Sequence, residues 1–575
     1  MTSVKTPATQ YDVCVIGSGA GGAPIAYELS RAGYRTAVLE KGGWYDEGDF
    51  KKDEKLSRRR IFRSKLGEEP QVLVQRDGAG RWADQKTARF WGGSIVGGAS
   101  NFMSGYFHRL KPQDFRLLSE FGPIDGANIA DWPIEYDDLE PYYTKVEGLI
   151  GVSGAVVDHP SLEPRSTPDF PFPPTAEHPI AGWFDRSARE LGLHPLPLAR
   201  AILSRPFNGR DACEYSGYCG GYGCRSGAKG SARAALLNEA VVTGRCDVVT
   251  HAKAYHINTD SRGNAVSVDY YNGHGNSIRV HAAVIVVACY SIESSRLLLA
   301  SVGEKHPHGI GNRYGQLGRN LHCCAGGTGH GIFDLTQLTR QQAAGLKQRG
   351  PFFNRALQDW YFIDDETAFR QRMKGGTIDF VFDSPTPTAD ANTLKWDQDH
   401  RLIWGSAFKQ RLKSHFTESS DFKFEVFCDW LPTDDCNVSL DGATTDKWGS
   451  PVARVQIHNH PHDLKVAGYL VDKGVQVMRQ MGAHRYFGNA FTAPTTNLIA
   501  GGLRFGRDPE TSALDRDCRV HGTDNLFVTD GSFMPTGGSV TPTWTIYANS
   551  FRVADRIVAD LGGTRTPVPE PDQAT

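Results

Sequence analysis

The chain of 575 residues is too long to fold around a single hydrophobic core, so we expect at least two domains. Its 39% hydrophobic and 22% charged residues are ordinary for a globular protein, and the formal net charge of -2 argues against a nucleic-acid binder. No apolar run reaches the roughly 18 residues of a transmembrane helix, the N-terminus lacks the apolar core of a signal peptide, and eleven mostly scattered cysteines argue against a disulfide framework.

The N-terminal residues predict a strand, a helix and a second strand in succession. The first strand is expected over Tyr11–Ile16, the helix over Ala23–Ala32 and the second strand over Arg35–Leu39. An acidic residue, Glu40, directly follows the second strand. This order is typical of a βαβ unit that binds a dinucleotide.

Three glycines form the spacing GxGxxG between the first strand and the helix. Gly17 permits the tight turn, Gly19 lets the backbone approach a pyrophosphate, and Gly22 lets the helix pack closely on the strand. The helix N-terminus faces the phosphate charge, and Glu40 can accept a hydrogen bond from a ribose hydroxyl. The pattern predicts dinucleotide binding, but by itself it does not distinguish FAD from NAD.

A cysteine-rich loop occurs in the middle of the chain. Cys213, Cys219 and Cys224 lie close together among glycines, and three thiolates on such a loop can reach one iron cluster. The alternative is a purely structural loop, with or without a disulfide.

Periodic patterns continue after this loop. Three alternating runs predict strands of an antiparallel sheet, at residues 376–383, 401–410 and 421–432. A long amphipathic helix is predicted over residues 462–483.

The C-terminal segment "NLFVTDGSFMPTGGSVTPTWTIYANSFRVADRI" predicts a strand at Asn525–Thr529, a turn at Asp530 and Gly531, and a helix from Pro542 onward. A segment that returns so late in the chain to complete a nucleotide site is typical of flavoproteins that bind an extended FAD. The segment therefore favours FAD.

Together these stretches resemble the glucose-methanol-choline (GMC) oxidoreductases, and the resemblance covers nearly the whole chain. "GGSIVGGASN", residues 92–101, is similar to the family's glycine loop near the flavin, and "AAVIVVACYSIESSRLLLAS" is similar to the strand and helix that return to the FAD domain. Within the family, the chain is most similar to the flavoprotein subunits of bacterial gluconate, sorbitol and fructose dehydrogenases.

The resemblance implies an α/β fold: a Rossmann-type FAD-binding domain plus an α+β substrate domain with a mostly antiparallel sheet. The FAD-binding domain is expected to be discontinuous, over residues 1–120, 210–325 and 495–575. The substrate-binding domain is expected over residues 121–209 and 326–494.

The resemblance also assigns residues to cofactors. Those expected to bind FAD are Gly17, Gly19, Ala20, Gly22, Glu40, Lys41, Gly97, Gly98, Asn101, Asp530, Gly531 and Thr543. Some relatives carry a [3Fe-4S] cluster that relays electrons from FAD to a cytochrome partner, which here implies Cys213, Cys219 and Cys224 as ligands. The gluconate-type pattern often has a further cysteine where this chain has Ser216, and related alcohol oxidases have similar loops that need not hold a cluster.

The proton acceptor is the point where the sequence departs from the family. Flavin N5 takes the hydride, so the protein must take the hydroxyl proton. A histidine normally stands before the glycine-rich turn that here ends at Gly506, and a second histidine or an asparagine stands before a Pro-Thr pair. Asn497 and Thr541 occupy these regions, so we expect both residues at the flavin, although neither is a base.

Three interpretations remain open. The base can come from elsewhere, with candidates at His108, His322, His458, His460, His462 and His484. Alternatively, Asn497 only hydrogen-bonds the substrate hydroxyl while water takes the proton. Last, the chain has lost dehydrogenase activity or performs different flavin chemistry.

Our main hypothesis is therefore an FAD-dependent dehydrogenase that oxidises an alcohol group of a sugar, sugar acid or polyol. Electrons would leave through an iron–sulfur cluster or directly to a quinone or cytochrome acceptor. The alternatives are a GMC-type oxidase that uses oxygen on a glycoside or larger alcohol, and a catalytically silent flavoprotein subunit. The missing signal peptide fits a cytoplasmic enzyme, or a periplasmic one that is exported together with a small partner subunit.

Overall fold

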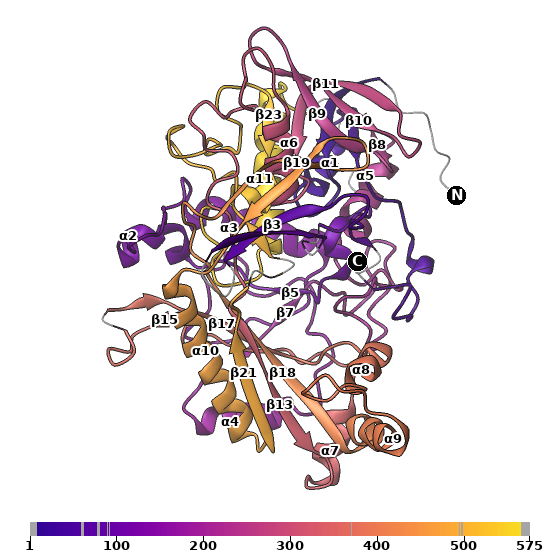
Figure 1. Ribbon diagram of the computed structural model, residues 1–575, viewed down its shortest axis with the longest axis vertical. Helices are drawn as coiled ribbons and strands as arrows, with labels where there is room; N and C mark the ends of the chain where they lie inside the picture. The colour runs from indigo at the N-terminus through magenta and orange to yellow at the C-terminus, as the bar shows by residue number, and fades with distance from the viewer. Residues whose placement is uncertain are drawn as a thin grey trace.

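Two large sheets organise the molecule, one in the upper and one in the lower half of Figure 1. The computed structural model describes residues 9–58, 62–76, 81–88, 90, 92–369, 371–493, 495 and 498–564. Within these ranges, every helix is too short or too polar to span a membrane.

The upper sheet has seven strands in the order β8-β2-β1-β11-β10-β9, and β23 also pairs with β11. Its strands are β1 (Gln10–Ile16), β2 (Thr36–Leu39), β8 (Cys246–Val249), β9 (Lys253–Thr259), β10 (Ala265–Tyr271), β11 (Ser277–Val287) and β23 (Leu526–Val528). The pairs of β1 with β2 and β11, β2 with β8, and β11 with β23 are parallel. Strands such as β2 are buried along their whole length, as parallel strands covered on both faces must be.

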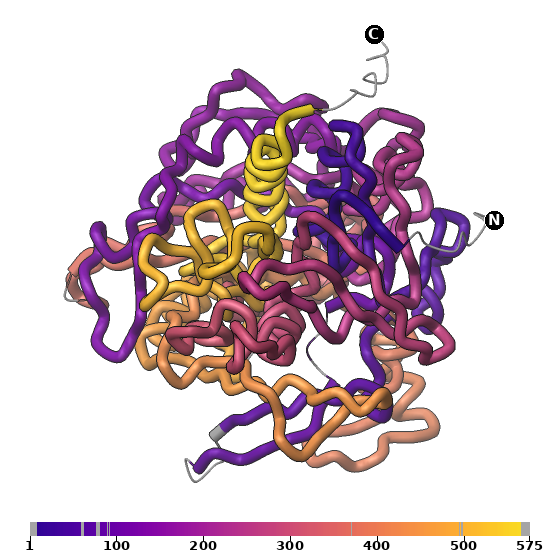
Figure 2. Tube along the Cα trace, turned by 90° about the horizontal axis from the view of Figure 1, so that it is seen from above, coloured from indigo at the N-terminus to yellow at the C-terminus, as the bar shows by residue number. Residues whose placement is uncertain are grey.

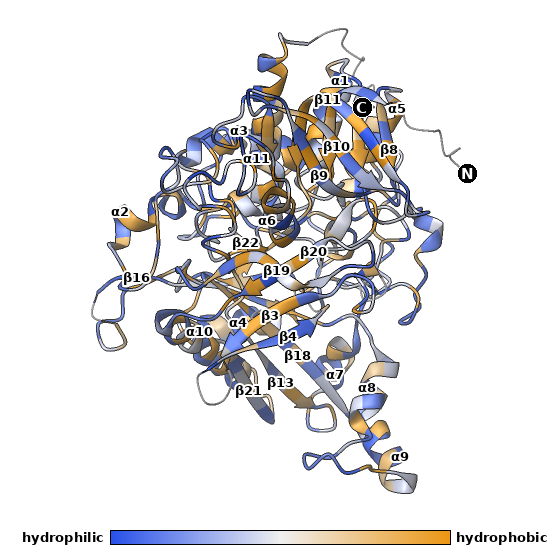
Figure 3. Cartoon of the chain, turned by 45° about the horizontal axis from the view of Figure 1, so that its top comes forward, coloured by the Kyte–Doolittle hydropathy of each residue, from blue (hydrophilic) through white to orange (hydrophobic). Residues whose placement is uncertain are grey.

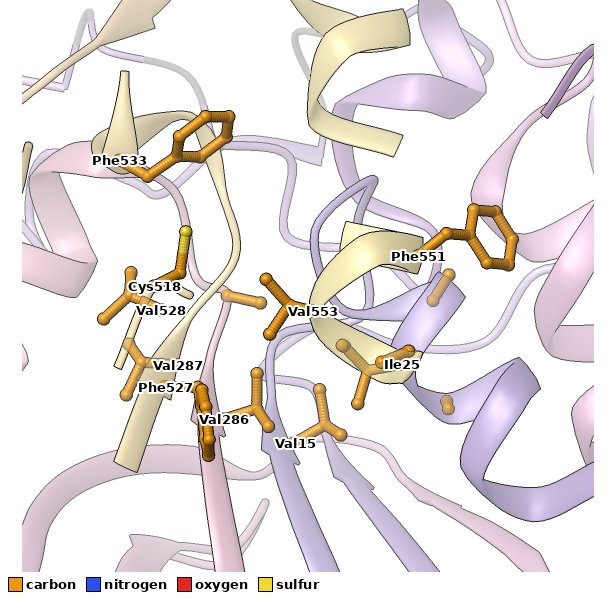
Figure 4. Packing of buried hydrophobic residues seen from close by; sticks show 14 of the residues in the cluster. Val15, Ile25, Val286, Val287, Cys518, Phe527, Val528, Phe533, Phe551 and Val553 are labelled. Carbon is orange, nitrogen blue, oxygen red and sulfur yellow. The ribbon is translucent and has the colours of Figure 1, made fainter. Parts of the chain in front are cut away.

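Helices from the two ends of the chain pack together against this sheet. The first helix, α1 (Ala23–Arg31), and the last, α11 (Thr543–Asp560), lie side by side, and Figure 2 shows the yellow C-terminal helix beside the indigo N-terminal segment. Figure 4 shows Ile25 of α1 and Val553 of α11 close to Val15 of β1 and Val286 of β11. Complete burial of each such side chain contributes about 1.5–3 kcal/mol.

The lower sheet has six antiparallel strands in the order β21-β13-β18-β17-β14-β6. Its strands are β6 (Leu196–Pro197), β13 (Gly327–Asp334), β14 (Arg355–Leu357), β17 (Gly376–Val381), β18 (Ser419–Cys428) and β21 (Arg485–Ala490). Helix α10 (Pro461–Gln480) packs on one face, where Phe422 and Phe424 of β18 are buried. Lys423 and Glu425 alternate with these residues and are only partly buried, as the twofold period of a strand requires.

The remaining elements connect the sheets or cover them. A four-stranded sheet consists of β3 (Gln71–Arg76), β4 (Trp82–Thr87), β19 (Asn437–Thr445) and β20 (Pro451–Gln456). Two-stranded pairs are β5 (Tyr106–Phe107) with β7 (Ala199–Arg200), β12 (His322–Cys323) with β22 (Ile499–Ala500), and β15 (Phe362–Ile363) with β16 (Met373–Lys374). The other α-helices are α2 (Leu117–Phe121), α3 (Tyr136–Ile150), α4 (Ala181–Glu190), α5 (Asn238–Val242), α6 (Ser291–Ala300), α7 (Arg340–Lys347), α8 (Pro387–Leu394) and α9 (Gly405–Lys413).

One predicted strand is wrong. Residues 401–410 were expected to join the antiparallel sheet, but the chain turns into helix α9 at Gly405. The predicted strands at the start of the chain and at β17 and β18, and the predicted long helix at α10, are confirmed. The residue bounds of the two expected domains remain a prediction.

Candidate active site

A cavity of about 500 Å³ extends from the upper sheet to the lower one. At one end it is lined by the turn between β1 and α1, and at the other by β17, β18 and the residues that follow β17. Both ends belong to one continuous space. A bound molecule can therefore contact both sheets at once.

The glycine turn, residues 17–22, combines tight packing with one open position. Gly17 has φ +103°, and a Cβ there would lie 2.3 Å from the carbonyl oxygen of Ala288. A Cβ at Gly22 would lie 2.0 Å from the carbonyl oxygen of Gly17, so only glycine permits this packing. A Cβ at Gly19, by contrast, meets no atom within 4 Å, and Gly19 lines the cavity. No side chain caps the N-terminus of α1, so its amides are available to a phosphate.

Glu40 lies at the carboxyl end of β2 and lines the same cavity. Its Oε2 accepts a hydrogen bond from the Ser18 hydroxyl at 2.5 Å, and its Oε1 accepts one from the Gly42 amide at 2.8 Å. Burial raises the pKa of Glu40, while these hydrogen bonds and the charge of Lys41 act in the opposite direction. Because the Ser18 amide also donates to Oε2, at 3.3 Å, it is Oε1 that keeps a further acceptor position for a ribose hydroxyl.

The C-terminal segment closes the glycine turn from the far end of the chain. The hydroxyls of Thr529 and Ser550 both donate to the carbonyl oxygen of Gly21, at 2.8 Å and 2.5 Å. Next to them Asp530 lines the cavity, and its pKa is raised by burial. Its Oδ1 accepts a hydrogen bond from the Ser532 amide at 2.9 Å.

Most residues expected to bind FAD lie on the cavity wall. The lining includes Gly17, Gly19, Ala20, Glu40, Lys41, Gly98, Asp530, Gly531 and Thr543. Gly22, Gly97 and Asn101 lie behind it. The Gly97 amide donates to the Ser18 hydroxyl at 3.0 Å, and the Asn101 side-chain amide donates to the carbonyl oxygens of Val96 and Gly98. The open Gly19, the uncapped helix and the buried Glu40 fit a dinucleotide, but each residue's contact with FAD stays a prediction.

The opposite wall of the cavity carries charged side chains that the sequence analysis did not select. Lys423 Nζ lies 2.8 Å from Glu425 Oε1 and 3.3 Å from Asp383 Oδ1. Burial lowers the pKa of Lys423, but the charges of Glu425 and Asp383 outweigh it and raise the pKa overall. The only available signal was the alternation of β18, which places both polar residues on the face away from α10.

Tyr106 faces the same space from the upper half of the cavity. Arg200 lies over its ring at 4.6 Å, and its hydroxyl makes no hydrogen bond to another residue in the described ranges. Burial, and next the charge of Glu425, raise the pKa of Tyr106 well above its ordinary value. The phenol is therefore a proton donor toward the cavity.

No histidine occurs among the described residues that line the cavity. His108 Nε2 lies 3.1 Å from Asp379 Oδ1 in the interior, and His322 Nε2 donates to the Met534 carbonyl oxygen at 3.0 Å. The other candidates, His458, His460, His462 and His484, also lie away from the lining. The idea that one of these histidines replaces the family's base is therefore not supported.

Asn497 lies outside the described residues, so its expected position at the flavin remains a prediction. Thr541 is described and stands directly before Pro542 and Thr543, which line the cavity. Its hydroxyl donates to the carbonyl oxygen of Tyr106 at 3.3 Å. A direct contact between Thr541 and the flavin also remains a prediction.

In the described part of the chain, the cysteine-rich loop is not assembled as a metal site. Cys213, Cys219 and Cys224 are free thiols that line the cavity, yet the described residues contain no group of three or more His, Cys, Asp or Glu side chains that could hold a metal ion. Burial raises the pKa of Cys213 to about 12 and also raises that of Cys219. The predicted [3Fe-4S] cluster is thus not supported.

This arrangement, with a βαβ glycine turn completed by a C-terminal segment, defines a dinucleotide-dependent oxidoreductase. The family model for GMC oxidoreductases matches residues 175–324 and, in its second part, residues 432–550. The chain is 30% identical to the 6'''-hydroxyparomomycin C oxidase of Streptomyces lividus over 559 residues, which cover 96% of this chain and 92% of that protein. The chain belongs to the GMC oxidoreductase family.

Other relatives match over a similar length. The 2-methyl-1,2-propanediol dehydrogenase of Mycolicibacterium austroafricanum is 29% identical, with 96% of both chains covered. The gluconate 2-dehydrogenase flavoprotein of Pantoea cypripedii is 24% identical, with 96% of this chain and 94% of that protein covered. Among solved structures, formate oxidase shares the fold with a TM-score of 0.60 at 15% identity, over 97% of this chain and 99% of that chain.

The expected fold class and family are therefore confirmed. Members of the family are FAD-dependent oxidoreductases that act on alcohols, and this protein is an enzyme of that class.

Proposed function

We propose that the protein oxidises an alcohol group of a sugar, sugar acid or polyol and passes the electrons to an acceptor other than NAD. The observation that carries this proposal is the charged wall formed by Lys423, Glu425 and Asp383, which faces the glycine turn across one cavity. A polyhydroxylated molecule supplies donors and acceptors that replace the water on these groups. A largely apolar alcohol such as a sterol would leave them unsatisfied, which costs roughly 1–3 kcal/mol for each group.

The names of the relatives agree with a hydroxylated small substrate. They describe a dehydrogenase of a propanediol, an oxidase of hydroxyparomomycin C and a flavoprotein of a gluconate dehydrogenase. We extend from them only the chemical class.

Two residues of the cavity wall act directly on the substrate in this proposal. FAD, when bound, supplies the hydride acceptor. Glu425 takes the hydroxyl proton, because its side chain lines the cavity, is 32% exposed and lies 2.8 Å from the ammonium group of Lys423. The protonated Tyr106 hydroxyl donates a hydrogen bond to the same substrate oxygen or to its neighbour. With FAD bound as the hydride acceptor, loss of the hydroxyl proton to Glu425 would leave a carbonyl product.

Asn497 and Thr541 retain supporting roles. We propose that Asn497 orients the substrate hydroxyl by a hydrogen bond. Thr541 fixes the backbone of Tyr106 through the hydrogen bond to its carbonyl oxygen.

The electron acceptor is proposed to be a quinone or a cytochrome, with or without a small partner subunit. The large-subunit designation of the fructose dehydrogenase relative of Gluconobacter japonicus, 26% identical over 476 residues, supports a partner.

The experiment that tests the function is anaerobic addition of a mixture of sugars, sugar acids and polyols to the FAD-loaded protein. Bleaching of the flavin absorption bands is the expected result. Reoxidation of the bleached protein by a quinone analogue, but slowly by oxygen, would support a dehydrogenase, and fast reoxidation by oxygen would identify an oxidase. A flavin that stays oxidised with every substrate would contradict the proposal and favour a silent subunit.

Replacement of the proposed proton acceptor tests the mechanism. We expect Glu425→Gln to lower kcat by roughly 10²- to 10⁴-fold, the usual range for a lost general base. The dissociation constant of FAD should not change. The matched control is Asp383→Asn, which removes the other carboxylate that contacts Lys423 and should have a small effect. A larger loss in Asp383→Asn than in Glu425→Gln would refute the assignment.

A further inference from the structure

A helical hairpin projects from the lower half of the molecule. It comprises residues 386–418, with α8, the loop 395–404, α9 and one π-helical turn at Ser414–Glu418. Figures 1 and 3 both show α9 at the outer end of this projection, away from the two large sheets. Neither α8 nor α9 contains a buried residue.

Large apolar side chains are exposed together on the loop of this hairpin. Trp396, Leu402 and Trp404 are 40%, 56% and 79% exposed. Trp396 and Leu402 form an antiparallel bridge, so their side chains lie on the same side of the backbone pair. Trp404 follows Leu402 by two residues in an extended conformation and therefore points to that side as well. The half-buried Ile403 between them points the other way.

Such a group differs from scattered exposed apolar residues. A single exposed leucine needs no explanation, but two tryptophans and a leucine on one face mark a binding surface. Phe416, on the π-helical turn of the same hairpin, is also 47% exposed.

Unpaired positive charge accompanies this apolar face. Lys409 and Arg411 on α9 are exposed and form no ion pair within the described ranges. The nearby acidic Asp397 is engaged in its own turn, where it accepts hydrogen bonds from the amides of Asp399 and Arg401. Lys413 is paired with Glu418 at 3.1 Å. Arg411 Nη1 donates to the Trp396 carbonyl oxygen at 3.1 Å, so the two cations lack an acidic partner and are complementary to an anionic one.

The base of the hairpin is attached to the cavity mouth. Asp383 and Ser384, which lead into the hairpin, line the cavity. The Glu54 carboxylate accepts hydrogen bonds from the Thr388 and Ala389 amides, at 2.8 Å and 3.0 Å, and so fixes the first turn of α8. The hairpin is thus held in place beside the route into the active site.

We propose that the 386–418 hairpin binds the surface of an anionic lipid membrane. Trp396, Leu402 and Trp404 would enter the interface between headgroups and acyl chains, where the amphipathic indole ring is most stable. Lys409 and Arg411 would contact the anionic headgroups. The projecting tip of the hairpin carries tryptophans beside cations. This shape is complementary to a flat, deformable membrane surface rather than to a preformed groove in a protein. The cavity mouth would then face the layer from which a lipid-soluble electron acceptor can arrive.

The test is co-sedimentation of the FAD-loaded, full-length protein with lipid vesicles. We expect binding to vesicles of phosphatidylcholine mixed with phosphatidylglycerol, weaker binding to phosphatidylcholine alone, and release by salt. The double variant Trp396→Ser/Trp404→Ser should lower the affinity by on the order of tenfold or more. Lys409→Gln and Arg411→Gln should each lower it by roughly fivefold on anionic vesicles only.

The matched control is Trp82→Ser, which removes a tryptophan outside the hairpin, 39% exposed on β4. It should bind vesicles like the unchanged protein, and every variant should keep its flavin content and melting temperature. The proposal is overturned if neither kind of vesicle binds, or if the tryptophan variant binds as well as the parent. It is also overturned if sedimentation velocity shows Trp404-dependent self-association instead, or if polyglutamate binds the hairpin while vesicles do not.

Discussion

A methyl group added at Gly19 meets no protein atom within 4 Å, whereas one added at Gly17 or Gly22 would collide with backbone. The spacing GxGxxG does not distinguish the three glycines, but the structure shows that they are not all required for the same reason. Gly17 and Gly22 are required by the protein itself. Gly19 is required only if something occupies the cavity beside it.

This difference gives a prediction for Gly19→Ala. The apoprotein should keep its free energy of unfolding within about 0.5 kcal/mol, because the new Cβ lies in open space. Its affinity for FAD should fall by roughly tenfold or more, because the methyl group occupies the position where the pyrophosphate approaches. Isothermal titration of the apoprotein with FAD and urea unfolding provide the two measurements.

Gly48→Ala is the matched control, since a Cβ at Gly48 also meets no atom within 4 Å. It should change neither quantity. Unchanged FAD affinity in Gly19→Ala would mean that the pyrophosphate does not lie against the glycine turn.

Short sequence patterns selected the residues at the glycine-turn end of the cavity, but not the charged residues at its other end. The glycines and Glu40 follow one another closely, and their roles depend on backbone conformation and strand ends that short patterns reveal. Lys423, Glu425 and Tyr106 line one cavity only because the fold brings β18 and β5 to it. The spacing of residues along the sequence does not indicate this arrangement. The candidate histidine His322 hydrogen-bonds to a backbone carbonyl oxygen instead of lining the cavity, and no sequence pattern indicates such a role.

Among the elements, α3 is anchored by an unusually buried ion network. Arg109 donates to Glu147 from Nε at 3.0 Å and from Nη2 at 2.6 Å, and also contacts Glu140 at 2.8 Å. Its guanidinium also lies over the ring of Trp544 in α11. The network thus joins α3 to the helix that completes the upper core.

We predict that Arg109→Met destabilises the protein by roughly 3–5 kcal/mol, because it leaves buried Glu147 without one of its partners. Urea unfolding followed by circular dichroism measures the change. The control is Arg279→Met, which breaks a two-point contact to Asp269 at an exposed site and should cost less than about 1 kcal/mol. Equal losses in the two variants would contradict this account.

The mistaken strand at residues 401–410 has a physical explanation. Leu402 and Trp404 alternate as in a strand, and this extended pair does exist. Trp404, Phe408 and Leu412, however, are spaced by four residues, which is the period of the helix that begins at Gly405. The strands β1, β17 and β18 gave a single period over their length, which explains why they could be predicted.

For the molecule as a whole, buried neutral histidines link stability to pH. His178 and His322 are both nearly inaccessible to solvent, and burial lowers the pKa of each to about 4. In the unfolded chain both would titrate near 6.5. Between these two pKa values, both histidines are protonated in the unfolded chain but neutral in the native protein.

The free energy of unfolding should therefore fall as the pH drops from about 6.5 to about 4, by up to roughly 1.4 kcal/mol per pH unit for each histidine. His322→Gln should reduce the dependence of the unfolding free energy on pH by the contribution of one histidine, whatever the substitution does to stability at neutral pH. Urea unfolding at pH 7 and pH 5 gives the comparison. An unaltered slope in His322→Gln would be evidence that His322 is already protonated in the native state.

The closure of the glycine turn by Thr529 and Ser550 has a consequence for biosynthesis. The hydrogen bond from Ser550 to Gly21 spans 529 positions of the chain. At the usual 5–20 residues per second, the ribosome needs roughly 25–100 s between these two residues. During that interval β1 and α1 are already outside the ribosome, but they lack α11 and the strand β23 that completes their sheet. The cofactor can find its finished binding surface only after α11 has been synthesised, so the emerging N-terminal part must be kept from aggregation until that helix arrives.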